Sequence, residues 1–453
     1  MSMATAIYPG PTPASAEREA RRRFVVKAVF FIFILSLVEG PLRKWFLPGL
    51  ATPLTILRDP FVIALYAYCL AHGLMLRRGI AKLWLGFAII TSIVGLAQYA
   101  AQGLPAYGWM LGVRTYWLYM PLAFVVAKTF TREDIHRFLR LCLWIAIPYA
   151  FLVAAQYNAP PYVFINLGVG ADESGAVGVG DGILRPFGLF TYTGPNVQFT
   201  AFMIAVFIAF YVGDVQMRRR GLFLVASGAA VGAMSVLTGS RLIYLLAAGI
   251  FAITLLGMTT ARPSGRTLRR ALGIISLPMF AAALLLFAFP DMLDAMIDRF
   301  NRAARSEGGI YDRIYYSGFT WLDALFDASV FGYAIGAGAP GVARMLDLPA
   351  LFLGEADTQR NVRELGVLLG GSFLLLRWGT TAWVLFLAFR LAVHKSIWAL
   401  PLAGYVTVPL TLGQITHSPI NAFLPWLSIG LIIALRNDLY RDKLVRRIPH
   451  ASN

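Results

Sequence analysis

Residues 242–260, LIYLLAAGIFAITLLGMTT, contain no charged side chain over a length that matches the hydrocarbon core of a bilayer. Comparable apolar runs recur to the end of the 453-residue chain, which is 58% hydrophobic and only 14% charged. Soluble domains carry about one-quarter charged residues. The sequence therefore excludes an ordinary soluble enzyme and predicts an all-α fold, a polytopic bundle of transmembrane helices.

About twelve spans are expected from the apolar runs. They lie at residues 24–38, 54–75, 82–101, 109–128, 138–157, 196–213, 221–238, 242–260, 271–289, 364–390, 396–415 and 420–436. Residues 1–20 are expected to be disordered and residues 437–453 to form a basic tail, with the transmembrane domain, 21–436, between them. Long external loops are expected at 158–195 and 291–363. Within the second, amphipathic stretches at 294–305 and 312–326 predict short helices on the membrane surface.

The distribution of charge predicts the orientation. The formal net charge is +17, and most of the 40 lysines and arginines fall on the side of the bundle that carries the Arg21–Arg23 run. By the positive-inside rule, both termini are then cytoplasmic and the long loops are external. Anionic membrane lipids are the expected partners of the basic side, and no nucleic-acid partner is expected. Cys69 and Cys142 lie inside apolar runs and indicate no disulfide framework.

Several arginines lie where a predicted helix meets or enters the outer side of the bilayer. A guanidinium at that boundary is costly, so a functional role is the first hypothesis and snorkelling to lipid headgroups is the alternative. Its planar fork binds phosphate oxygens bidentately and does not lose its charge. The cluster therefore predicts a site for a pyrophosphate carried on a lipid. Its members are Arg114, Arg185, Arg241, Arg360, Arg363 and Arg377.

Two segments have the features expected of such an anion site. In residues 185–196, RPFGLFTYTGPN, Pro195 suits the first turn of a helix and Asn196 lies beside it, so the amides of that turn are expected to face an outer cavity and bind an anion. Ser240 and Arg241 lie between two closely spaced spans. The alternatives are a plain loop-to-helix junction in the first segment and a tight turn with an interfacial arginine in the second.

A third segment, residues 355–366, EADTQRNVRELG, ends the second long loop. Arg360 and Glu364 stand at i, i+4 on a helix and are expected to pair. A carboxylate there, Glu364 or Glu355, could take the proton of an acceptor hydroxyl while arginines stabilise a departing pyrophosphate. A structural ion pair that anchors the loop is the alternative.

These segments, in this order, resemble the O-antigen ligase and polysaccharide polymerase superfamily of bacterial envelope proteins. That family has an arginine before a Gly-aromatic and Asn segment that leads into a central span, a Ser-Arg pair after a mid-chain span, and Glu-x-Gly after a large external loop. The matching residues are Arg185, Gly188, Gly194 and Asn196, then Ser240 and Arg241, then Glu364, Leu365 and Gly366.

The resemblance implies a GT-C-like, metal-independent glycosyltransferase without a cofactor, located in the bacterial inner membrane with its active site facing the periplasm. Its donor would be an undecaprenyl-diphosphate-linked oligosaccharide, with Arg185 and Arg241 on the diphosphate. The ligases carry a His-Asn pair where this chain has Arg360-Asn361, which favours a polymerase that extends another lipid-linked glycan. A ligase acting on lipid A and a transporter of lipid-linked oligosaccharide stay open as alternatives, as does a partner protein that regulates chain length.

The sequence thus predicts two sets of site residues. Trp321 is a candidate platform for stacking a sugar, and His417 lies near the outer face. No metal site is expected, because the histidines lack ligand spacing. The predicted catalytic residues are Arg185, Arg241, Arg360, Glu364 and Glu355, and the predicted substrate-binding residues are Arg114, Asn196, Ser240, Arg363, Arg377, Trp321 and His417.

Overall fold

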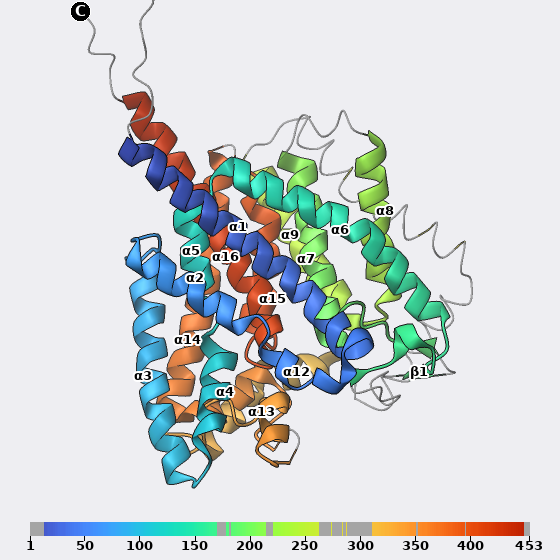
Figure 1. The fold of residues 1–453 in the computed structure, drawn as a ribbon, viewed down its shortest axis with the longest axis vertical. Helices are drawn as coiled ribbons and strands as arrows, with labels where there is room; N and C mark the ends of the chain where they lie inside the picture. Colours follow the sequence, from blue (N-terminus) through green and yellow to red (C-terminus); the bar gives the residue numbers. More distant parts are fainter. Residues whose placement is uncertain are drawn as a thin grey trace, which may run out of the picture.

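The computed structural model describes residues 13–169, 178–180, 183–213, 221–261, 310–349, 352–394 and 396–447, with isolated positions at 273, 283 and 287. Helices dominate this part of the chain (Figure 1). They are α1 (Pro13–Pro41), α2 (Asp59–Ala71), α3 (Ile80–Ala101), α4 (Ala106–Trp117), α5 (Met120–Thr129), α6 (Arg132–Asn158), α7 (Thr193–Gly213), α8 (Gly221–Leu237), α9 (Arg241–Ala261), α12 (Ile310–Asp327), α13 (Pro340–Met345), α14 (Asp357–Val393), α15 (Ala399–Thr411) and α16 (Pro419–Arg447). Short elements complete the list: the π-helix η1 (Leu42–Phe46), the 3-10 turns η2 (Pro48–Leu50), η3 (Pro53–Ile56) and η4 (Phe164–Asn166), and the antiparallel strands β1 (Gly178–Gly180) and β2 (Ile183–Leu184).

The helical bundle confirms the predicted fold class. Among the described residues, eight helical segments are long and apolar enough to cross a membrane, or nine if α4 and α5, bent by 42° at their junction, form one span. The apolar helices α8 and α15 are shorter. The span expected at 271–289, apart from three isolated positions, and the helix expected at 294–305 lie outside the described residues. α12 confirms a helix at 312–326. A total of twelve spans stays a prediction.

The N-terminal boundary differs from the expectation. Residues 13–20, predicted to be disordered, form the first turns of α1. Ion pairs at i, i+4 join Glu17 to Arg21 and Glu19 to Arg23, which stabilises an exposed helix end. Arg22 adds a tertiary ion pair to Asp134 in the first turn of α6. The expected basic tail is likewise helical through Arg447, and the start of α1 and the end of α16 lie at the same end of the bundle (Figure 1).

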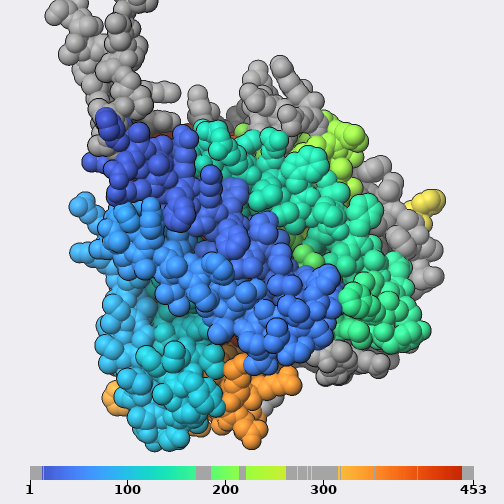
Figure 2. All heavy atoms as spheres, in the orientation of Figure 1, coloured from blue at the N-terminus to red at the C-terminus, as the bar shows by residue number. Residues whose placement is uncertain are grey.

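Two helices form the centre of the bundle. In α7 and α16, 89% of the apolar window is buried, compared with 28% in α3. On α3 a row of large side chains, Leu83, Ile89, Ile90 and Ile93, is exposed instead. The face drawn in Figure 2 is covered by α1, α2, α3 and α6 around this centre. An apolar exterior around a buried centre is what a bilayer requires of its helices.

The backbone of α14 departs from helical geometry near its start, and one side chain of α3 forms hydrogen bonds with backbone groups at this break. Gly366 takes the left-handed backbone conformation, φ 86°, inside α14. The Gln98 amide nitrogen donates to the carbonyls of Glu364 (2.9 Å) and Phe331, and its oxygen accepts from the backbone N–H of Ile335 at 3.0 Å. The first turns of α14, the loop at 331–335 and α3 are therefore tied together.

Candidate functional site

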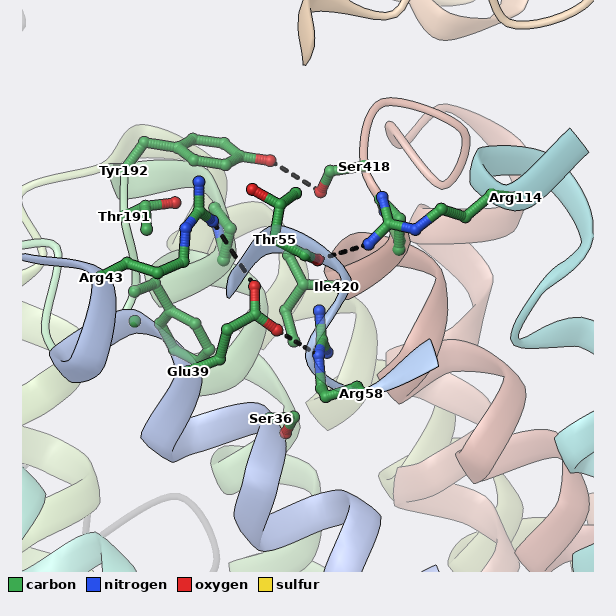
Figure 3. Close-up of a pocket in the computed structure, with 14 residues that line it drawn as sticks. Ser36, Glu39, Arg43, Thr55, Arg58, Arg114, Thr191, Tyr192, Ser418 and Ile420 are labelled. Carbon is green, nitrogen blue, oxygen red and sulfur yellow. Dashed lines mark hydrogen bonds and ion pairs between the residues drawn. The ribbon is translucent and has the colours of Figure 1, made fainter. Parts of the chain in front are cut away.

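A cavity of about 90 Å³ lies where α1 ends and α16 begins (Figure 3). The end of α1 is remote from the end of the bundle where α1 starts and α16 ends (Figure 1). Several segments far apart in sequence meet at the cavity: the end of α1 with η1, the start of α2, α4, and the first turns of α7 and α16. We refer to it as the arginine pocket. Its lining residues are Ser36, Glu39, Gly40, Arg43, Thr55, Arg58, Arg114, Phe190, Thr191, Tyr192, Pro195, Ser418, Pro419 and Ile420.

Guanidinium groups outnumber carboxylates at the arginine pocket. Glu39 forms ion pairs with Arg58 and, at 3.5 Å between Oε1 and Nη1, with Arg43 (Figure 3). Arg114 pairs with Asp59 and donates from Nη2 to the Thr55 carbonyl at 2.6 Å. Among the described residues, this group comprises three arginines and two carboxylates. The group therefore has a formal charge of +1.

Arg58 is the least satisfied of these cations. It is only 3% exposed, and its guanidinium lies 5.4 Å from the centre of the Tyr119 ring. Its Nη1 has no hydrogen-bond acceptor among the described residues, and its Nε contacts Glu39 only as an ion pair. Buried donors in folded proteins nearly always have an acceptor. A polar ligand in the arginine pocket would supply one.

Two helix N-termini add positive potential to the arginine pocket. α7 contributes Pro195 from its first turn and α16 contributes Pro419 and Ile420. The Tyr192 hydroxyl donates to Ser418 Oγ at 2.8 Å and so joins the two helix starts (Figure 3). Burial raises the pKa of Tyr192 to about 12, which keeps its O–H protonated. Unpaired backbone N–H groups and the helix dipole favour an anion at such a place.

A second polar cluster, the buried ion-pair network, lies on the first turns of α14. Asp357 accepts from Arg360 and from Thr416 Oγ1 (2.7 Å) through one oxygen, and from Arg377 Nη1 (3.0 Å) through the other. Arg360 Nε lies 3.4 Å from Glu364 Oε1, which confirms the predicted i, i+4 pair. The side chains of both arginines and both carboxylates are fully buried, so two cations balance two anions away from solvent.

The carboxylate of Glu364 is enclosed by the protein. Its Oε2 accepts from the Tyr116 hydroxyl, and its Oε1 accepts from the backbone N–H of Gly338 at 2.8 Å. Arg377 is enclosed too: its N–H groups donate to Asp357, to Asn361 and to carbonyls of residues 409, 410 and 413. All five of its N–H groups are used within the protein. These bonds indicate that Arg377 positions its neighbours.

The buried ion-pair network and the arginine pocket are adjacent along the chain at residues 416–418. Thr416 belongs to the network and Ser418 to the pocket, with His417 between them. His417 Nδ1 and Arg360 Nη1 are buried and have no hydrogen-bond partner among the described residues. Burial and the neighbouring Arg360 charge lower the pKa of His417 to about 4. Its ring is therefore neutral at pH 7, 6.0 Å from the Tyr192 ring.

The resemblance implies that Arg185 and Arg241 contact a diphosphate. In the structure Arg185 directly follows β2, in the loop that leads to α7, and Arg241 begins α9. Arg185 is partly buried directly before Pro186, whose carbonyl accepts from Asn196 Nδ2 at 2.7 Å. Asn196 is fully buried and also accepts from the Tyr149 hydroxyl at 2.6 Å, so it fixes this segment to α7. Arg241 is the partly buried first residue of α9, directly after Ser240. Arg185, Arg241 and Arg360 are not among the described lining residues of the arginine pocket.

Three other predicted residues belong neither to the lining of the arginine pocket nor to the buried ion-pair network. Glu355 has an exposed side chain just before α14, and Arg363 forms an ion pair with Asp327 of α12. Trp321 packs edge-on against Trp378, with ring centres 5.2 Å apart, and donates to the Gly318 carbonyl at 2.7 Å. In this conformation Trp321 joins α12 to α14.

Sequence reasoning selected Arg114 but missed most of the arginine pocket. Arg58 lies inside the expected span 54–75, where the rule applied to the other boundary arginines would have singled it out. Glu39 follows the expected span 24–38 and was detectable as a rare acidic residue at a span end. Asp357 lies in the third predicted segment, residues 355–366, but was not among the predicted site residues. Among the described residues, no group of three or more His, Cys, Asp or Glu could hold a metal ion.

No family model and no curated protein matches this sequence. The geometry of the arginine pocket and of the buried ion-pair network therefore carries the functional argument.

Proposed function

We propose that the protein is a membrane glycosyltransferase that takes glycan from an undecaprenyl-diphosphate-linked donor and transfers it to a hydroxyl of another lipid-linked glycan. It acts as a polysaccharide polymerase at the periplasmic face of the bacterial inner membrane. The observation that carries the proposal is the arginine pocket, in which three guanidinium groups and two helix N-termini converge at the end of the bundle opposite the basic N-terminal run.

The chemistry needs a stabilised leaving group. The acceptor oxygen bonds to the anomeric carbon, the bond from that carbon to the diphosphate oxygen breaks, and its electron pair leaves with the diphosphate. Arg43, Arg58 and Arg114 neutralise that developing charge, and Arg58 Nη1 donates the hydrogen bond for which the described residues offer no acceptor. No redox step and no metal is required.

The acceptor proton must go to a base. Glu364 is a poor choice while both of its oxygens accept hydrogen bonds within the buried ion-pair network. Glu355 keeps an exposed carboxylate on the segment that leads into α14, and it is the base we propose. The buried ion-pair network then holds this segment and residues 416–418 beside the arginine pocket.

The test uses purified protein in detergent micelles with an undecaprenyl-diphosphate-linked repeat unit as both donor and acceptor. Micelles have no two sides, so longer glycans require an enzyme. We expect Arg58→Ala to lower the rate by about 10²–10³-fold, the range measured when one donor to a developing anion is removed. Arg58→Lys should recover part of the rate, because lysine keeps the charge and loses the fork. Arg137→Ala is the matched control, since Arg137 is an exposed arginine at the other end of the bundle.

Two results would overturn the proposal. One is wild-type elongation by Arg58→Ala with a normal yield of folded protein. The other is a wild-type protein that does not lengthen the glycan in micelles but moves the lipid-linked unit across the membrane of vesicles. That result would identify a transporter. If Arg58→Ala does not fold, Arg58→Lys decides the role of this position, and its rate must fall below that of Arg137→Ala.

A further inference from the structure

We infer that Glu39 is a specificity-determining residue, whose carboxylate holds the charge of the arginine pocket at a value that suits the diphosphate diester of the donor and disfavours the diphosphate monoester of the product. The inference rests on the proposed function. It concerns how the product leaves, which the proposal above does not address.

The position of Glu39 is fixed by the fold. It lies near the end of α1, is 7% exposed, and directs one carboxylate oxygen to Arg43 and the other to Arg58 (Figure 3). The next residue, Gly40, packs so closely on the backbone of Leu189 that a Cβ there would meet the Leu189 carbonyl oxygen. The end of α1 therefore has little freedom to carry Glu39 away from the two guanidiniums.

The charge of the site can be counted from its groups. Arg43, Arg58 and Arg114 contribute three positive charges, and Glu39 and Asp59 contribute two negative ones. The N-termini of α7 and α16 each add roughly half a positive charge. The total is about +2. Without Glu39 it would be about +3.

The two states of the ligand differ by about one charge. The donor diphosphate is esterified at both ends, by sugar and by lipid, and carries two negative charges. Transfer of the glycan frees a terminal phosphate oxygen whose second ionisation has a pKa near 6, so the product carries about three negative charges at pH 7. With Glu39 present, the site charge of about +2 balances the two negative charges of the donor. The product, with about three negative charges, keeps one that is not balanced and lies beside the Glu39 carboxylate. Electrostatic mismatch of this kind promotes release of the product.

The test measures binding of two probes to the full-length protein in detergent. Inorganic pyrophosphate represents the ionised product end, and P1,P2-dimethyl diphosphate represents the doubly esterified donor. We expect Glu39→Gln, which keeps the shape and removes the charge, to tighten pyrophosphate binding tenfold or more and to tighten binding of the dimethyl ester by a clearly smaller factor. Glu133→Gln, at an exposed ion pair at the other end of the bundle, should change neither. In turnover assays, polyprenyl diphosphate should inhibit Glu39→Gln at about one-tenth of the concentration needed for wild type.

Glu39→Asp separates charge from shape, because it retains the carboxylate on a shorter side chain and should keep the wild-type preference between the probes. Equal tightening of both probes by Glu39→Gln, or the same shift in Glu39→Asp, would overturn the inference and leave the proposed function standing. If wild type binds neither probe, or Arg58→Ala binds both as tightly as wild type, the diphosphate site itself fails and the proposed function fails with it.

Discussion

Replacing Asp357 with asparagine should destabilise the protein more than any exposed charge substitution does. Asp357 is fully buried and accepts bonds from the guanidiniums of Arg360 and Arg377. Its loss changes a neutral cluster of two cations and two anions into one with a net buried positive charge. Removing one partner of a buried ion pair costs about 3–5 kcal/mol. An unfolding entropy of about 2.1 cal/mol/K per residue gives roughly 1 kcal/mol/K for this chain, so the melting temperature should fall by about 3–5 °C.

The assay is thermal unfolding of the purified protein in one detergent, followed by intrinsic tryptophan fluorescence. Asp323→Asn, at an exposed position on α12, is the control and should stay within about 1 °C of wild type. The double variant Asp357→Asn with Arg377→Met restores the charge balance and should recover at least half of the loss. A single variant that melts with wild type would refute the argument. A double variant that melts as low as the single would show that hydrogen bonds, rather than charge balance, carry the effect.

Two further predictions concern a histidine and a glycine. Because the pKa of His417 is about 4 in the folded protein and near 6.5 when unfolded, the unfolded chain binds more protons between these values. Stability should therefore rise from pH 4 to pH 6.5 and reach its full value above pH 6.5. His417→Asn should flatten that slope in thermal melts recorded at several pH values, and an unchanged slope would contradict the assignment. Gly366→Ala should greatly reduce the yield of monodisperse protein in size-exclusion chromatography, because φ is 86° and a Cβ would meet the Val330 carbonyl. Gly379→Ala, in open space on the same helix, should leave the yield unchanged, and equal yields from the two variants would count against this reasoning.

The helices were predictable because their apolar runs are local. The expected span 242–260 lies within α9, Arg241–Ala261, since an uncharged run has one stable state in a bilayer. The expected span 109–128 hid a break between α4 and α5. Pro121 stands in the first turn of α5 and has no N–H for a bond to the preceding turn. The N–H of Leu122 bonds to the Tyr119 carbonyl, and the Leu118 carbonyl accepts from the Tyr66 hydroxyl at 2.6 Å instead. That proline is the signal in the sequence from which the break could have been predicted.

The site was predictable only where its contacts follow helical spacing. Arg360 and Glu364 pair at i, i+4, as expected from the sequence. The partnership of Glu39 with Arg58 depends on how the turns after α1 fold back, and no local pattern specifies it. Burial is equally non-local. The sequence selects Arg377 as a boundary arginine, yet only the fold shows that every N–H of Arg377 has an internal acceptor.

Gln98 ties the loop at 331–335 to the first turns of α14. Its single amide bonds to the carbonyl of Glu364 and to backbone groups of residues 331 and 335, so displacing that loop strains the turns that carry Arg360. The backbone N–H of Tyr333 adds a direct bond to the Arg363 carbonyl at 2.8 Å. A displacement of the loop would therefore reach the start of α14 both directly and through the Gln98 side chain of α3.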